Sequence, residues 1–311
     1  MDLFIRLFSL AVFASTLRIA TPIILASMGG IMSERSGVIN IGLEGMMLMG
    51  AFTAVVGSYF MGPWVGLILG ITAGGMMGLL HAFMSVTIGA NQIISATAIN
   101  IMAVGFPNIL IPVIWPGHFG ISPTVEVIED IRIPVIASIP VIGRIIGQQN
   151  PIVYVALFLV AAIHFLLFKT RLGLRIRAVG EHPMAADTLG IHVYKMRYIA
   201  VVSSGMLAGL GGSFLSICYQ SQFASAMTAG RGFIGLAAMI FGRWSPKGAL
   251  AACLLFGFAD AFQSGAQAAG VPIPPELMLA FPYVLTLIAL VGLLGKTAVS
   301  PAATGKVYRK E

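Results

Sequence analysis

A few carboxylate and amide side chains lie inside otherwise apolar runs of this chain of 311 residues. Polar groups in such runs are costly, and they usually face a cavity or a polar partner. Amides combine donors with acceptors, which suits a neutral solute rich in hydroxyl and nitrogen groups. These side chains either line a route for such a solute or join neighbouring helices by hydrogen bonds. The candidate pathway residues are Asn40, Glu44, Gln92, Asn100, Asp260 and Gln263.

Asn40 and Glu44 stand in the glycine-rich segment Gly29–Ala51. They are four residues apart and would share one face if the segment were helical. The neighbouring glycines also allow the backbone to leave the helix. A discontinuous segment that lines a cavity is the expected way to present polar groups at membrane depth.

The composition indicates a polytopic membrane protein with an all-α fold. Hydrophobic residues make up 58% of the chain and charged residues 9%, whereas soluble domains contain about 25% charged residues. A helix needs about 20 apolar residues to span a bilayer. We expect about eight full spans and one short half-helix or re-entrant helix at 232–242, which must be buried by protein. The expected full spans are 4–32, 44–61, 64–88, 92–115, 151–168, 198–219, 248–268 and 277–295.

The distribution of charge predicts the orientation of a single membrane domain that covers residues 1–311. The polar stretch 169–197 holds 6 of the 18 Lys and Arg residues, and a basic excess in short loops marks the cytoplasmic side. The loop 116–150, which contains three acidic residues, is then extracytoplasmic. Counting spans also places the N-terminus outside and the basic tail 296–311 inside.

A short exposed helix is expected within the cytoplasmic stretch. The segment Glu181–Asp187 has a proline near its first turn, and Gly190 can end the helix. Ala185, Ala186 and Gly190 would form a low surface, while Glu181 and Asp187 could meet basic groups of a partner. An ordinary solvated loop is the alternative.

Glycines recur every four residues along one expected span, at Gly66, Gly70, Gly74 and Gly78, and Gly205 and Gly209 repeat the spacing in another. Stripes of small residues allow helices to pack closely in lipid. We interpret both stripes as packing surfaces.

The segments 33–50, 173–190 and 230–248 together resemble the inner-membrane permeases of ATP-binding-cassette (ABC) importers of the branched-chain amino acid/ribose class. Within that class the chain is most similar to nucleoside permeases. The resemblance implies an ATP-driven importer of a small polar solute, with nucleosides as the expected substrates and branched-chain amino acids or sugars as the alternatives. It also implies a bacterial inner-membrane location and a coupling helix that fits a cytoplasmic ATPase. That helix would include Gly180, Glu181, Ala185, Ala186, Asp187 and Gly190.

The expected partners are an ABC ATPase, a second permease subunit that forms a heterodimer, an extracytoplasmic substrate-binding lipoprotein and the lipid bilayer. A stand-alone secondary transporter is the main alternative, although it would not need a site for an ATPase. Nucleic acid is not an expected partner, because the basic residues are scattered among loops.

We expect neither an enzyme nor a cofactor site. The sequence has no glycine-rich phosphate loop that ends in Lys-Ser or Lys-Thr, and no His, Cys or acidic set with metal-ligand spacing. Cys218 and Cys253 lie in apolar runs as inert thiols. His81 and His164 are expected to pack between helices or to reach toward the cytoplasmic surface.

Overall fold

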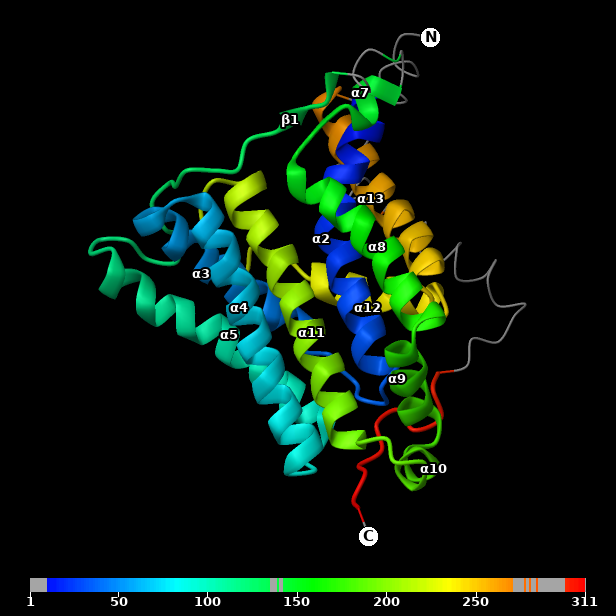
Figure 1. Cartoon of the computed structure of the whole chain (residues 1–311). Coiled ribbons are helices and arrows are strands. Elements are labelled where there is room, and N and C mark those ends of the chain that lie inside the picture. Colours follow the sequence, from blue (N-terminus) through cyan, green and yellow to red (C-terminus); the bar gives the residue numbers. More distant parts are fainter. Residues whose placement is uncertain are drawn as a thin grey trace.

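A computed structural model describes residues 10–134, 142–270 and 300–310, with single positions between these ranges. Within this part of the chain, seven helices are long and apolar enough to cross a membrane (Figure 1). The predicted all-α bundle is therefore confirmed. The eighth expected span, 277–295, lies outside the described residues.

The helices follow the expected spans closely, with shifts of a few residues at their ends. α4 and α11 each continue into a short π-helical turn, η1 and η2. The spans are α2 (Leu10–Glu34), α3 (Leu43–Met61), α4 (Pro63–Ala82) with η1 (Phe83–Thr87), α5 (Gln92–Ile114), α8 (Pro151–Lys169), α11 (Val193–Phe214) with η2 (Leu215–Tyr219) and α13 (Pro246–Ala268). The short helix α12 (Arg231–Phe241) matches the predicted half-helix.

The core of the bundle is formed by α2, α3, α4 and α11, where the glycine stripes meet. A Cβ atom at Gly74 would overlap the backbone of Gly205, and one at Gly209 would overlap the backbone of Gly70. The helix axes can come this close only because these positions lack side chains. The predicted packing role of both stripes is confirmed.

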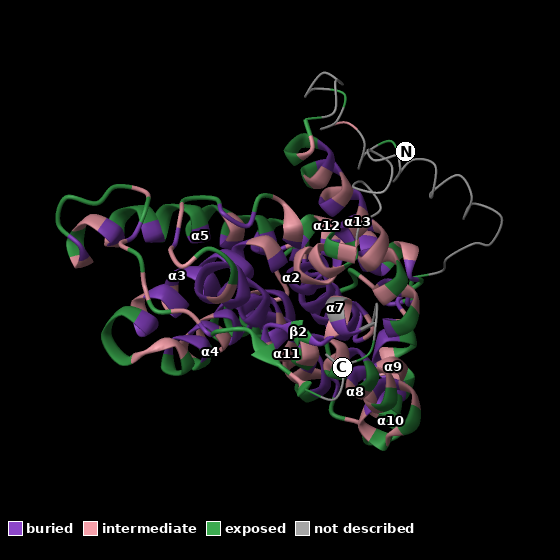
Figure 2. Ribbon diagram, turned by 90° about the horizontal axis from the view of Figure 1, so that it is seen from above, coloured by how far each residue is buried: buried purple, intermediate pink, exposed green. Residues whose placement is uncertain are grey.

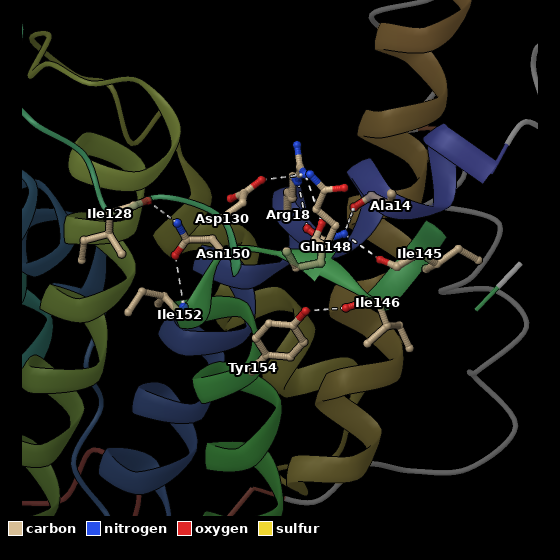
Figure 3. Close-up of polar contacts among 11 residues, drawn as sticks. Ala14, Arg18, Ile128, Asp130, Ile145, Ile146, Gln148, Asn150, Ile152 and Tyr154 are labelled. Carbon is tan, nitrogen blue, oxygen red and sulfur yellow. Dashed lines mark hydrogen bonds and ion pairs between the residues drawn. The ribbon is translucent and has the colours of Figure 1, made fainter. Parts of the chain in front are cut away.

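One end of the bundle carries the loop that the sequence predicts to be extracytoplasmic. The loop includes a two-residue ribbon of β1 (Ile131–Arg132) and β2 (Gln148–Gln149) and the short helix α7 (Ile142–Ile146). Arg18 of α2 fixes the ribbon, because its guanidinium group lies 3.0 Å from Asp130 and donates to Gln149 at 2.8 Å (Figure 3).

The opposite end carries α9 (Arg171–Glu181), α10 (Pro183–Thr188) and the C-terminal segment 300–310 (Figure 1). α10 is the short helix expected from the sequence, and Gly190 follows it with a positive φ of 78°. The eleven-residue helix α9 was not expected. Thr170 caps α9 by accepting a hydrogen bond from the backbone N–H of Gly173.

The helices of the bundle differ in how much of their surface is buried, as Figure 2 shows. The buried residues gather in α2, α3 and α11, whereas α5 is the least buried of the seven spans. The α5 side chains Ile101 and Val113 are 69% and 71% exposed. α5 therefore presents an apolar face that no other described part of the chain covers.

Candidate functional site

The chain leaves helical geometry between α2 and α3, at residues 35–42, which we call the break segment. Two of the predicted pathway residues hold its backbone. The Gln92 Oε1 atom accepts the N–H of Ile39 at 2.7 Å, and Asn100 Nδ2 donates to the carbonyl of Ile41 at 3.1 Å. Non-helical backbone that is largely buried needs such partners, because its N–H and C=O groups are not satisfied by a helix.

His81 of α4 also holds the break segment. Its Nε2 atom lies 2.9 Å from the carbonyl oxygen of Ile39, and its Nδ1 atom lies 3.0 Å from the hydroxyl of Ser95. The carbonyl can only accept, so Nε2 carries the proton and Nδ1 accepts from Ser95. Sequence reasoning missed this role, because nothing in the apolar run around His81 distinguishes it from a packing residue.

Two amides, Asn40 of the break segment and Gln92 next to it, have unused hydrogen-bonding capacity. The side chain of Asn40 is fully buried and donates to Ser204 Oγ at 3.0 Å, but its Oδ1 atom has no partner among the described residues. The Nε2 atom of Gln92 likewise lacks a partner in the described part of the chain. A buried polar atom without a partner costs about 1–3 kcal/mol. One acceptor and one donor at this place are thus left without a partner among the described residues.

Glu44 joins two helix N-termini. It lies in the first turn of α3, and its two carboxylate oxygens accept the backbone N–H groups of Gly230 at 2.8 Å and Gly232 at 2.7 Å. These N–H groups belong to the start of α12, where the helix dipole favours a negative charge. A Cβ atom at Gly232 would overlap the backbone of Glu44, so glycine is required there. Both carboxylate oxygens of Glu44 thus have a partner, whereas Asn40 Oδ1 has none among the described residues.

Asn40 and Glu44 do not share a helix face, because Asn40 lies in the non-helical break segment. Asp260 and Gln263 lie farther away, on α13. That helix packs on α2, α8 and α12, whereas Gln92 and Asn100 belong to α5, which packs on α3 and α4. The structure brings Asn40, Glu44, Gln92 and Asn100 together and leaves Asp260 and Gln263 apart from them.

The predicted coupling residues divide between an exposed and an inward face. Ala185 is exposed on α10, whereas Ala186 is only 3% exposed and packs inward, contrary to the expectation that both would form the surface. The exposed surface also includes Met184 and Leu189, which is 81% exposed. Small and apolar side chains on a short helix fit a shallow apolar cleft.

The charged coupling residues have partners within the chain. Glu181 Oε2 accepts the backbone N–H of Ala302 at 3.1 Å, and Asp187 lies 3.7 Å from the ammonium group of Lys310. The chain's own C-terminal segment therefore meets the acids that the sequence suggested for a partner.

Gly180 connects α9 to the break segment. A Cβ atom at Gly180 would overlap the carbonyl oxygen of Arg35, so the two backbones are in direct contact. A Cβ atom at Gly190, in contrast, would meet no other atom of the described residues, and the positive φ of Gly190 serves the turn after α10.

Arg35 fixes the start of the break segment to the turn between α12 and α13. Its Nε atom donates to the carbonyl of Trp244 at 2.9 Å, and Trp244 Nε1 donates to Glu34 Oε2 at 2.6 Å. The guanidinium groups of Arg35 and Arg177 both lie over the ring of Phe168, at 5.7 and 5.1 Å from its centre. Sequence reasoning missed this junction, although it draws residues from all three of the segments that carry the family resemblance.

The environment lowers the pKa of Arg35 from its ordinary value. Burial is the main cause and the charge of Arg177 adds to it, while Glu181 acts in the opposite direction. An arginine keeps its charge at neutral pH even so, and the cation is stabilised by the Phe168 ring.

Comparison with known proteins identifies the family to which this arrangement belongs. The profile of the family described as "Branched-chain amino acid transport system / permease component" matches residues 12–290. The chain belongs to this family of ABC importer permeases. It is a transport subunit and not an enzyme, and it is a multi-pass protein of the cytoplasmic membrane.

Relatives with assigned names cover nearly the whole chain. The guanosine ABC transporter permease protein NupQ of Bacillus subtilis is 42% identical over 95% of both chains. The nucleoside ABC transporter permease protein NupC of Lactococcus lactis is 41% identical over 96% of both. A second guanosine permease protein of Bacillus subtilis, NupP, is 29% identical over 83% of this chain and 75% of its own length.

Proposed function

We propose that the chain is the permease subunit of an ATP-driven importer of nucleosides, with guanosine among its substrates. The observation that carries the substrate class is the similarity to NupQ and NupC, which extends over nearly the full length of all three chains. A free amide acceptor at Asn40 and a free amide donor at Gln92 match a neutral solute that has both kinds of hydrogen-bonding group.

The proposed pathway residues are Asn40, Gln92 and Asn100 at the break segment, with Glu44 holding the start of α12 beside them. Asp260 and Gln263 remain candidates on α13. They would belong to the same route only if helix movements or a second subunit brought α13 to it, and this makes them the weaker pair.

The proposed partners occupy different faces. An ABC ATPase would bind the exposed face of α10, and a binding lipoprotein would meet the loop 116–150. A second permease subunit would cover α5, whose apolar face is open and whose packing within this chain is slight. The relation to both NupQ and NupP supports a heterodimer, because Bacillus subtilis has two different guanosine permease proteins.

We also propose which segments of the chain lie on each side of the membrane. Residues 1–311 would form one permease domain, with 116–150 outside and with 169–197 and 296–311 on the cytoplasmic side. The Arg18–Asp130 contact at one end and the packing of 300–310 on α9 and α10 at the other support this division.

An uptake experiment tests the substrate and the source of energy together. Cells that produce the permease with its ATPase, second permease and binding protein should accumulate radiolabelled guanosine. Unlabelled purine and pyrimidine nucleosides should compete, whereas leucine and ribose should not. Competition by leucine or ribose alone would assign the chain to a sister group of the family. Uptake that survives inactivation of the ATPase would instead favour a stand-alone secondary transporter.

A further inference from the structure

Residues 300–310, which we call the strap, lie along the cytoplasmic end of the bundle and contact elements that are distant in the sequence (Figure 1). The strap is held by packing as well as by charge. Ala303 and Tyr308 are buried, although the segment follows the membrane domain and has exposed basic side chains at Lys306, Arg309 and Lys310.

On one side the strap binds the end of α9. The backbone N–H of Ala302 donates to Glu181 Oε2 at 3.1 Å, and the N–H of Ala303 donates to the carbonyl oxygen of Gly180 at 2.9 Å. These two bonds fix the residues that connect α9 to α10, so a movement of α10 must either carry the strap with it or break them.

On the other side the strap binds the break segment. The N–H of Gly305 donates to the carbonyl oxygen of Gly37 at 3.1 Å. Gly305 and Val307 also form one wall of a cavity of about 300 Å³, whose other walls include Ile39 and Gln92. The strap therefore reaches the backbone that carries Asn40 and the amide that holds Ile39.

Beneath the strap lies Arg197 of α11, whose side chain is only 1% exposed. Its Nη1 atom donates to the carbonyl oxygen of Lys306 at 3.1 Å, and the rings of Tyr194 and Tyr308 meet edge to face with 5.6 Å between their centres. The Nε and Nη2 atoms of Arg197 and the hydroxyl of Thr304 have no partners among the described residues.

This incomplete bonding bears on how firmly the strap is held. A buried cation is costly unless its donors are satisfied, and displacement of the strap would let water reach the free guanidinium nitrogens. The strap is held by several contacts, but the buried polar groups beneath it are not fully satisfied within the described residues.

From these contacts we propose that the strap adds to the direct contact between Gly180 and Arg35 and holds the α9–α10 unit against the break segment, so that movement of the bound ATPase is transmitted fully to the pathway only when the strap is intact. Arg197 acts as a positioning residue, because it holds the strap and does not meet the solute. This inference rests on the proposed coupling role of α10.

The test uses the complete transporter, purified and reconstituted in lipid. Four permeases are compared: the full chain, a chain that ends at residue 299, Gly305→Pro and Arg197→Met. Proline removes the N–H that binds Gly37 and cannot adopt the φ of 79° found at Gly305, so it displaces the strap locally. Methionine at residue 197 keeps apolar bulk without donors. The readouts are the amount of assembled complex, the basal ATPase rate and the stimulation of that rate by guanosine-loaded binding protein.

We expect the amount of complex and the basal rate to be maintained in all three variants. Stimulation should fall by at least about fivefold, the lower end of typical coupling between distant sites. Arg309→Ala, which changes an exposed strap residue, is the matched control and should behave as the full chain does.

Unchanged stimulation in the chain that ends at residue 299 would overturn the proposal. So would variants that assemble poorly but show normal stimulation per assembled complex, because the strap would then serve folding alone. The variant Ala185→Glu tests separately whether α10 docks the ATPase. If that variant still binds the ATPase and transports normally, α10 is not the docking helix, whatever the strap variants show.

Discussion

The Cα atom of Gly180 lies so close to the carbonyl oxygen of Arg35 that a methyl group at residue 180 would overlap that oxygen. The contact joins the last turn of α9 to the start of the break segment. A displacement of α9 and α10 would therefore act directly on Arg35, five residues before Asn40. It would not have to pass along a membrane helix to reach the break segment.

Substitution of Gly180 by alanine should disturb this contact. Overpacking against backbone costs about 1–3 kcal/mol, and we expect a lower midpoint of thermal unfolding in detergent together with reduced uptake per molecule. Gly105→Ala is the matched control for the unfolding midpoint, because a Cβ atom at Gly105 of α5 would meet no other atom of the described residues. An unfolding midpoint and an uptake in Gly180→Ala equal to those of the native chain would show that the Gly180 contact is not needed.

The bundle could be predicted from the sequence because its signals are local. Length and apolarity define a span such as α8, and the spacing of Gly70 and Gly74 defines a close helix contact. α9 was missed because its three Arg residues suggested a solvated loop. Its apolar side is revealed only by packing, as the burial of Ile176 and Val179 shows.

The site was predictable only in part. Residue type identified Asn40, Gln92 and Asn100, since amides in apolar runs are rare. Chain topology then decided which polar residues meet, and no local pattern indicates that α13 packs away from α5. The role of His81 depends on a carbonyl group 42 residues earlier in the chain. A contact between residues so far apart produces no periodic pattern in the sequence.

Ala185 and Ala186 should respond differently to the same change. Glutamate at the exposed position 185 should leave the amount of permease in the membrane unchanged and reduce the ATPase that co-purifies with it. Glutamate at the buried position 186 should lower the amount of folded permease, because an unpaired charge would enter the packed side of α10. Immunoblots of membrane and affinity-purified fractions measure both quantities, and the reverse pattern would place the ATPase elsewhere.

Removal of the Glu44 carboxylate should loosen α12. Loss of an N-terminal helix cap costs about 0.5–2 kcal/mol, so Glu44→Ala should lower the thermal unfolding midpoint in detergent. Glu44→Gln keeps one accepting oxygen and should lie between alanine and the native residue. Glu129→Ala, in the exposed loop, serves as the control and should leave the midpoint unchanged. If Glu44→Ala also left it unchanged, the bonds to Gly230 and Gly232 would contribute nothing to stability.

The orientation of the chain can be measured with introduced cysteines. A cysteine at Glu129 should react with an impermeant thiol reagent added to intact cells, whereas a cysteine at Glu181 should react only after the membrane is opened. The native Cys218, which is half-buried, and the buried Cys253 together give the background. Labelling of residue 181 from outside would invert the topology and remove the cytoplasmic face of α10 as an ATPase site.

The two groups of candidate pathway residues should differ when each polar side chain is replaced by leucine. Asn40→Leu removes the free acceptor beside the break segment, so guanosine uptake per permease molecule should fall by about tenfold, as expected for the loss of one to two kcal/mol of hydrogen bonding. Asp260→Leu should leave uptake per molecule nearly unchanged if α13 lies off the route, and Asp260→Asn should do the same. A large fall in uptake per molecule for Asp260→Leu, with a smaller fall for Asp260→Asn, would instead bring α13 into the pathway, because only the amide keeps hydrogen bonding. Uptake normalised to the permease amount in the membrane separates either result from a loss of folding.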